Sequence, residues 1–338
     1  MFRRSFLLTL AVLVGLAAGC AKMEEGPDPA EVAYDALKSA WNEAETTEAK
    51  LALAEDYLAQ YPDTKHSGSM AGAVAYYRGY ELEDPVGAWN VLSAALEKIK
   101  DPEQRFEVSM EGLGLADSVE VPLDLAEVAN ALGSVRPLTF SEHEQVAEMA
   151  IDLEEWTVAD EHSLAASLLA TPEQYREDYP DREFTDEEVT TRVQYRKASS
   201  LTNNAWAVFN LGDPEIAMQR FAEAEAAGSL TYLGVPNTPL YLFWGQAVLA
   251  QGDVDRAIEL LGAEALFGEE GSSATPYLRE AYAAKHGSDE GFDEFLWSTR
   301  NDLAKSADDF ELLDYEGNSR SLSETNGKVT LLAFWFPT

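Results

Sequence analysis

The sequence predicts a mainly helical protein. It predicts an α-solenoid of paired helices over residues 30–304, followed in residues 305–338 by the β-hairpin and strand that open an incomplete α/β domain. Apolar residues recur at three- and four-residue steps through most of the chain, which is typical of amphipathic helices. Glycines and small residues form a pattern that repeats along the helical part. The end of the chain changes to alternating and then continuously apolar sequence, which favours strands.

Residues 1–19 have the layout of an export signal. Arg3 and Arg4 give a basic start, and an apolar run then leads to small residues before Cys20. The apolar run is short and polar sequence follows it closely, which argues against a membrane-spanning helix. We therefore expect residues 1–19 to be a signal peptide.

The segment LAAGC, which ends at Cys20, resembles the bacterial lipoprotein signal, although Ala17 stands where that family usually has Leu. The resemblance implies that Cys20 becomes lipidated and that residues 20–29 form a polar tether. The protein would then be a membrane-anchored lipoprotein of the cell envelope, facing the periplasm or another extracytoplasmic space. An ordinary secreted protein and an uncleaved anchor are the alternatives.

The composition limits the classes of partner. Among 338 residues, 61 are Asp or Glu and 24 are Lys or Arg, which gives a net charge of -37. Such a charge repels phosphate backbones, so a nucleic-acid partner is not expected. The acidic residues indicate a soluble surface or an acidic binding face. Cys20 is the single cysteine, so no disulfide forms within these residues.

Helix-hairpin repeats are indicated by the spacing of small residues. The stretch AWAVFNLGDPEIAMQRFAEA places Gly212 at a turn and Phe221 between hairpins, and GQAVLAQGDVDRAIELL repeats the pattern around Gly252. These stretches resemble tetratricopeptide (TPR) hairpins, and a weaker copy surrounds Gly287. Gly212 and Gly252 are 40 residues apart, longer than the usual period of about 34, so GSLTYLGVPNTP is expected to form an extended connection.

The N-terminal part fits the same pattern, with Tyr76 as a repeat position and Asp84-Pro85 as a helix start. Residues 101–200 are helical but fit the repeat poorly. A TPR-like domain over residues 30–304 implies a concave surface for a protein or peptide partner. An unrelated all-helical bundle is the alternative, and the sequence does not indicate an oligomeric state.

The helical part carries no motif that predicts catalysis, a metal site or a cofactor. The acidic run from Asp152 to Glu155 lacks the alternation and glycine of a calcium loop, so we expect a solvated helix face. The histidines show no metal-ligand spacing and are expected on the surface. They are His66, His143, His162 and His286. Four tryptophans are expected in the core, namely Trp89, Trp156, Trp206 and Trp244.

The end of the chain predicts β structure. Alternation at Phe310, Leu312 and Asp314 around a turn at 316–318 predicts a hairpin, and the apolar run 329–336 predicts a strand buried on both faces. The order DFxLxDxxGxxxSLSExxGKVxLLxFW resembles the opening of TlpA/ResA-like thioredoxin-family proteins, which are exported, membrane-tethered thiol-disulfide oxidoreductases. Residues 305–338 would then be the N-terminal part of an incomplete thioredoxin-like domain.

The resemblance implies that the reactive motif follows Thr338 directly. In that family three residues separate the Phe-Trp pair from a Cys-x-x-Cys motif. The residues that would flank the active site are therefore Phe334, Trp335, Phe336, Pro337 and Thr338. Three explanations of this ending are open: a fragment, a truncated gene, or a selenocysteine codon taken as a stop. The function implied is a lipid-anchored thiol-disulfide oxidoreductase with a partner-binding helical domain. A non-catalytic lipoprotein scaffold and a peroxiredoxin-like peroxidase are the alternatives.

Overall fold

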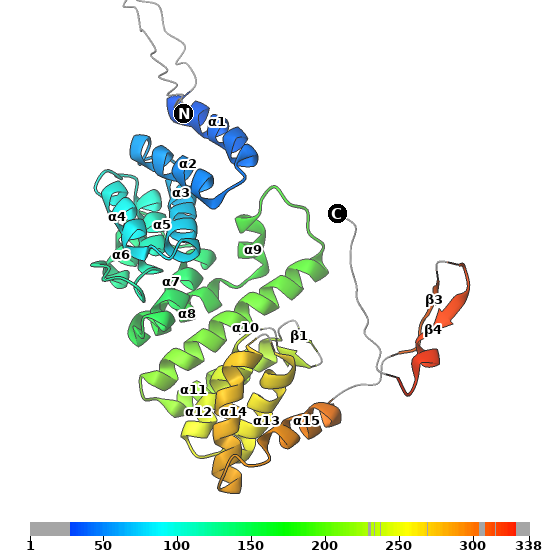
Figure 1. Ribbon diagram of the computed structural model, residues 1–338. Coiled ribbons are helices and arrows are strands. Elements are labelled where there is room, and N and C mark those ends of the chain that lie inside the picture. Colours follow the sequence, from blue (N-terminus) through cyan, green and yellow to red (C-terminus); the bar gives the residue numbers. More distant parts are fainter. Residues whose placement is uncertain are drawn as a thin grey trace, which may run out of the picture. The chain divides into compact units, whose positions relative to one another are not determined.

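The computed structural model describes residues 28–303, apart from 229, 230, 233, 237 and 269, and residues 308–328, apart from 315 (Figure 1). Helices dominate the described residues, so the prediction of a mainly helical protein is confirmed. The chain divides into two compact units, residues 1–123 and 124–338, and each is described by itself. This boundary falls within the range that the sequence analysis treated as one helical domain.

The first unit contains five α-helices and one π-helical turn among its described residues. They are α1 (Pro29–Glu43), α2 (Thr47–Gln60), α3 (Ser67–Val74), the π-helical η1 (Ala75–Glu81), α4 (Pro85–Leu96) and α5 (Pro102–Leu113). The helix start predicted at Asp84-Pro85 is confirmed, because the Gly87 backbone N–H donates to the Asp84 carboxylate at 2.9 Å. An acceptor at this position satisfies a donor that the helix itself leaves unpaired.

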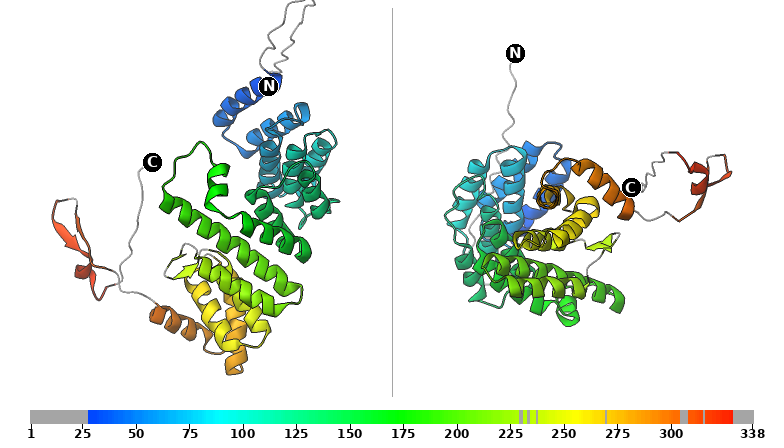
Figure 2. Two further views of the ribbon diagram at one scale, coloured as in Figure 1. Left: turned by 180° about the vertical axis from the view of Figure 1, so that it is seen from behind. Right: turned by 90° about the horizontal axis from the view of Figure 1, so that it is seen from below.

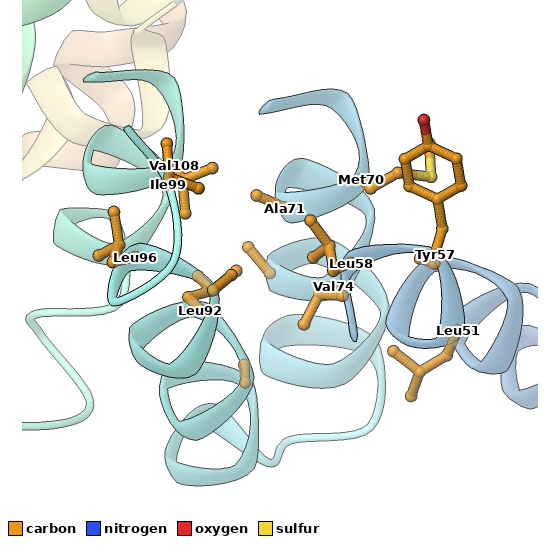
Figure 3. Packing of buried hydrophobic residues seen from close by; sticks show 14 of the residues in the cluster. Leu51, Tyr57, Leu58, Met70, Ala71, Val74, Leu92, Leu96, Ile99 and Val108 are labelled. Atoms are coloured by element: carbon orange, nitrogen blue, oxygen red, sulfur yellow. The ribbon is translucent and has the colours of Figure 1, made fainter. Parts of the chain in front are cut away.

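The core of the first unit lies where α2, α3 and α4 meet (Figure 3). Leu58, Val74 and Leu92 are each at most 1% exposed and pack in one cluster. Helix α4 therefore buries its apolar face in this cluster. Tyr76, predicted as a repeat position, is 53% exposed, so that prediction is wrong. Tyr76 lies in η1, and a π-helical turn takes an additional residue, which rotates the side chains out of the repeat register.

The second unit contains ten α-helices among its described residues. They are α6 (Leu125–Gly133), α7 (Phe140–Asp152), α8 (Trp156–Leu169), α9 (Pro172–Asp178), α10 (Asp186–Asn210), α11 (Pro214–Ala227), α12 (Leu240–Ala250), α13 (Val254–Phe267), α14 (Gly271–His286) and α15 (Phe292–Leu303). Helix α11 runs alongside α10, and α12 to α14 follow in the same array (Figures 1 and 2).

The predicted helix hairpins are present in this array. Gly212 and Gly252 occupy the turns between α10 and α11 and between α12 and α13, with φ of 91° and 84°. Glycine adopts this left-handed conformation without the steric cost that a Cβ would bring. Phe221 is fully buried, and its ring centroid lies 5.9 Å from that of Trp244 on α12. Phe221 therefore fills the space between successive hairpins, as predicted.

The connection between α11 and α12 contains a short β-bridge. Strands β1 (Thr231–Tyr232) and β2 (Val235–Pro236) pair antiparallel, so the predicted extended connection is confirmed.

A second hairpin lies near the C-terminal end of the described residues. Strands β3 (Glu311–Leu313) and β4 (Ser319–Ser321) pair antiparallel, with Leu312 opposite Arg320, and a short 3₁₀ helix η2 (Leu322–Thr325) follows. The Asp314 carboxylate accepts the Asn318 backbone N–H at 2.8 Å and closes the turn. The predicted hairpin is confirmed. The predicted strand 329–336 lies outside the described residues, as do residues 1–27.

Two buried helical glycines test how closely the helices approach one another. A Cβ built on Gly245 of α12 would lie 2.5 Å from Leu261 Cγ of α13, whereas one on Gly262 would lie 3.9 Å from its nearest neighbour, Thr299 Cγ2. We expect Gly245→Ala to lower the free energy of unfolding by about 1–3 kcal/mol through overpacking. Gly262→Ala should raise it by about 0.5–1 kcal/mol through improved helix propensity. Urea denaturation measures both, and equal effects would contradict the close approach.

Candidate functional site: an acidic cavity on helix α7

A cavity of about 240 Å³ lies within the second unit, between α7, α10 and the start of α12. Polar and charged side chains make up most of its lining, with a smaller apolar part. The residues that line it are Glu148, Ile151, Asp152, Tyr195, Ser199, Asn203, Thr238, Pro239, Phe243 and Glu270. Three are carboxylates, and of the described lining residues none is Lys or Arg.

Helix α7 contributes a row of carboxylates. Glu144, Glu148 and Asp152 are four residues apart, so they share one face of the helix. Glu148 and Asp152 line the cavity and are accessible to solvent. Glu144 lies one turn closer to the N-terminus of α7, and its Oε1 is buried with no hydrogen-bond partner among the described residues.

The surroundings of this row disfavour its negative charge. Burial, and then the charge of Glu148, raise the pKa of Glu144 from 4.5 to about 7. The hydroxyls of Ser199 and Ser200 and the charge of Arg196 act in the opposite direction but are weaker. Desolvation by the surrounding protein atoms also raises the pKa of Glu148, and the charge of Asp152 raises it further. Desolvation and mutual repulsion both favour the protonated acids.

The nearest cation on α10 is already engaged. Arg196 Nη1 donates to Asp178 Oδ2 at 2.6 Å, and its side chain is 9% exposed. Its guanidinium carbon also lies 4.2 Å from the ring centre of Phe140 and 4.6 Å from that of Tyr175. Arg196 therefore neutralises Asp178 within an aromatic cluster, and it compensates the α7 row only in part.

The opposite wall supplies one hydroxyl and one aromatic ring. Thr238 is 5% exposed, and no group of the described chain forms a hydrogen bond with its Oγ1. A buried hydroxyl without a partner costs about 1–3 kcal/mol. The Phe243 ring stacks on Trp206 of α10, with centroids 4.9 Å apart and planes at 9°. The stacking fixes the aromatic wall.

This arrangement is suited to binding a ligand. A binding site for a positively charged group is favoured, because acceptors from three elements converge on one small space. In the part of the chain that the structure describes, no group of three or more His, Cys, Asp or Glu is placed to hold a metal ion.

The histidines are not all on the surface, so this part of the prediction is wrong. His143 of α7 and His162 of α8 face one another with their Nδ1 atoms 3.1 Å apart, and His162 is 8% exposed. Burial lowers the pKa of both side chains, and the neutral rings share one hydrogen bond. His66 is half-buried and stacks on Tyr34, whereas His286 is exposed as predicted.

The other predicted residues divide into those inside and those outside the described range. Asp152 and Glu154 are exposed, as expected for a solvated face. The four tryptophans are partly buried, and Trp89, Trp206 and Trp244 pack against core clusters. Cys20 and the predicted flanking residues Phe334, Trp335, Phe336, Pro337 and Thr338 lie outside the described residues.

Sequence reasoning missed the cavity. The signal that could have found its acidic wall is the four-residue spacing of Glu144, Glu148 and Asp152. None of the described helices is long and apolar enough to cross a membrane.

Comparison with solved structures gives a weak likeness. No protein-family model and no curated protein matches the chain. The structure is similar to a crystal structure of a tetratricopeptide repeat protein from Parabacteroides merdae ATCC 43184, with 14% sequence identity and a TM-score of 0.35. The match covers 75% of this chain and 98% of that chain. A likeness of this strength does not place the chain in a family.

The raised pKa of Glu144 predicts a pH-dependent stability. The folded chain keeps this proton up to about pH 7, whereas the unfolded chain releases it near pH 4.5, so the folded state loses stability as the pH rises between these values. Glu144→Gln, which resembles the protonated acid, should therefore be more stable than wild type at pH 8, by up to about 3 kcal/mol, with little difference at pH 4.5. Urea denaturation at both pH values measures the effect.

Glu280→Gln, which changes an exposed residue of α14, is the control for this comparison. An equal gain in the two variants at pH 8 would contradict the local origin of the effect, since it would reflect only the reduced net charge.

Proposed function

We propose that the helical part of the protein is an interaction scaffold that binds a protein or peptide segment. The TPR-like pairing of helices supports this function, because stacked hairpins bury their own faces and present side chains of several helices to one partner. The observation that carries the proposal is the cavity between α7, α10 and α12, where a buried hydroxyl and several carboxylates have capacity for further hydrogen bonds.

The size of the cavity favours one side chain of a partner over a free small molecule. Its volume of about 240 Å³ is below the range of roughly 300–1,000 Å³ that is typical for small-molecule pockets. A peptide that runs over the helices could insert a single side chain there and gain further contacts outside. The cavity would then act as the anchoring point of a larger interface.

Selection from a library of random peptides tests this function with two matched variants. Ile151 lines the cavity, whereas Ile216 of α11 is 45% exposed and does not line it. Selected peptides should bind wild type and Ile216→Trp with similar affinity in isothermal titration calorimetry, and at least about tenfold more weakly to Ile151→Trp because the larger ring fills the cavity. Failure to select any peptide, or equal binding to all three proteins, would count against the scaffold.

We propose the redox function as a second candidate, together with the lipid anchor at Cys20 and the extracytoplasmic location. The β3–β4 hairpin supports it, because strands and turn form at the positions that the resemblance to TlpA/ResA-like proteins implies. Leu312 and Leu313 of this hairpin are 64% and 74% exposed, which is typical of a strand that further sheet structure covers.

The gene tests the redox candidate directly. We expect the reading frame beyond the codon for Thr338 to encode Cys, or UGA for selenocysteine, and then a second Cys three positions later. The corresponding protein should reduce insulin disulfides, and should lose this activity when the first position of the motif is changed to Ser, because the attacking thiolate or selenolate is then absent. A reading frame that continues without such a motif would refute the redox function and leave the scaffold.

A further inference from the structure

The charge of the cavity selects the sign of its occupant. Glu148, Asp152 and Glu270 line it, Glu144 lies behind Glu148, and Arg196 is held by Asp178. Burial and the charge of Asp152 both raise the pKa of Glu148, so its negative charge is disfavoured, and a bound cation would offset that effect. The net charge of -37 adds a long-range attraction for basic partners. An anionic occupant would add to the repulsion among these carboxylates, and a purely apolar occupant would offer them no hydrogen-bond donor.

Thr238 supplies an independent indication of a ligand. Its side chain is 95% buried, lines the cavity, and has an Oγ1 without a hydrogen-bond partner in the described structure. A hydroxyl oxygen in this position can accept a hydrogen bond from a donor on the ligand. Glu148 and Asp152 lie on α7 and Thr238 precedes α12, so one ligand with donors on several sides would satisfy both walls.

The described side chains distinguish between possible cations. Among the residues that the structure describes, no group of three or more His, Cys, Asp or Glu is placed to hold a metal ion. A guanidinium is larger and flat, with five N–H donors in a fixed fork, and it stacks on aromatic faces. Phe243, fixed by its stacking on Trp206, offers such a face in the same cavity.

We propose that this cavity binds the guanidinium group of an arginine side chain on the partner segment. Glu148 and Asp152 accept its hydrogen bonds from one side, Thr238 accepts from the other, and Phe243 contacts its face. The inference rests on the proposed scaffold function and names the residue that anchors the partner. It assigns the acidic wall of α7 and the unpaired hydroxyl of Thr238 to a single ligand.

The test compares three blocked tripeptides that differ in one side chain. Acetyl-Gly-Arg-Gly-amide, its citrulline analogue and its lysine analogue are titrated into the protein by calorimetry at low ionic strength. Citrulline keeps the shape of arginine and removes its charge. We expect the arginine peptide to bind at least about tenfold more tightly than either analogue, because only the guanidinium combines charge with the forked donors.

Three variants locate the binding. Glu148→Gln should weaken the arginine peptide at least about tenfold, whereas Glu280→Gln, which removes the same charge elsewhere, should leave it unchanged. Thr238→Val should also weaken binding and should at the same time stabilise the free protein, because it removes a buried hydroxyl that lacks a partner. Circular dichroism confirms that each variant is folded.

Several outcomes would overturn the arginine site. These are no binding of the arginine peptide, equal binding of the citrulline or lysine peptide, and equal weakening by Glu148→Gln and Glu280→Gln. None of them refutes the scaffold itself. The scaffold is tested separately, with library peptides that contain every residue type and with the loss of their binding in Ile151→Trp. Conversely, selected peptides that bind through the cavity without arginine would support the scaffold and exclude this ligand.

Discussion

The close approach of neighbouring helices at small residues is the constraint on which the helical array depends. Gly245 leaves room for Leu261 between α12 and α13, and fully buried Ala217 and Ala224 do the same for α11 against its neighbours. Each hairpin buries its apolar face against the next one, so the small positions and the turn glycines must recur. The same packing holds α7, α10 and α12 at fixed positions, and a polar cavity between them needs such support.

Helix α10 changes character along its length, and this change explains where the cavity lies. Its C-terminal half presents Leu201, Ala205 and Val208 to the hairpin core. Its middle presents Arg196 and Ser199 in the neighbourhood of the acidic face of α7. Apolar side chains between α7 and α10 would pack together and fill the cavity. The polar side chains instead line it with hydrogen-bonding groups that a ligand can contact.

The predictable parts of the fold are those that local sequence determines. The turns at Gly212 and Gly252 were predictable because a tight turn between two amphipathic helices needs a residue in the left-handed conformation, and glycine adopts that conformation most readily. The register around Tyr76 was not, since the π-helical turn depends on how η1 packs. The facing pair His143 and His162 was also missed, because contacts between α7 and α8 depend on how two helices pack. The acidic row of α7 was visible as a spacing, but the partial burial of Glu144 involves Arg196, Ser199 and Ser200 of α10, more than forty residues away in the sequence.

Burial of Glu144 behind the cavity couples the charge of a ligand to the protonation of the protein. In the empty cavity, desolvation and the charge of Glu148 keep the Glu144 proton up to about pH 7. A guanidinium beside Glu148 would offset that negative charge and bring a positive charge close to Glu144, and both changes lower the pKa of Glu144. Near neutral pH, part of the carboxyl population would then release its proton as the cation binds. The carboxyl that destabilises the free protein at higher pH would therefore be stabilised in its charged form by a cationic partner.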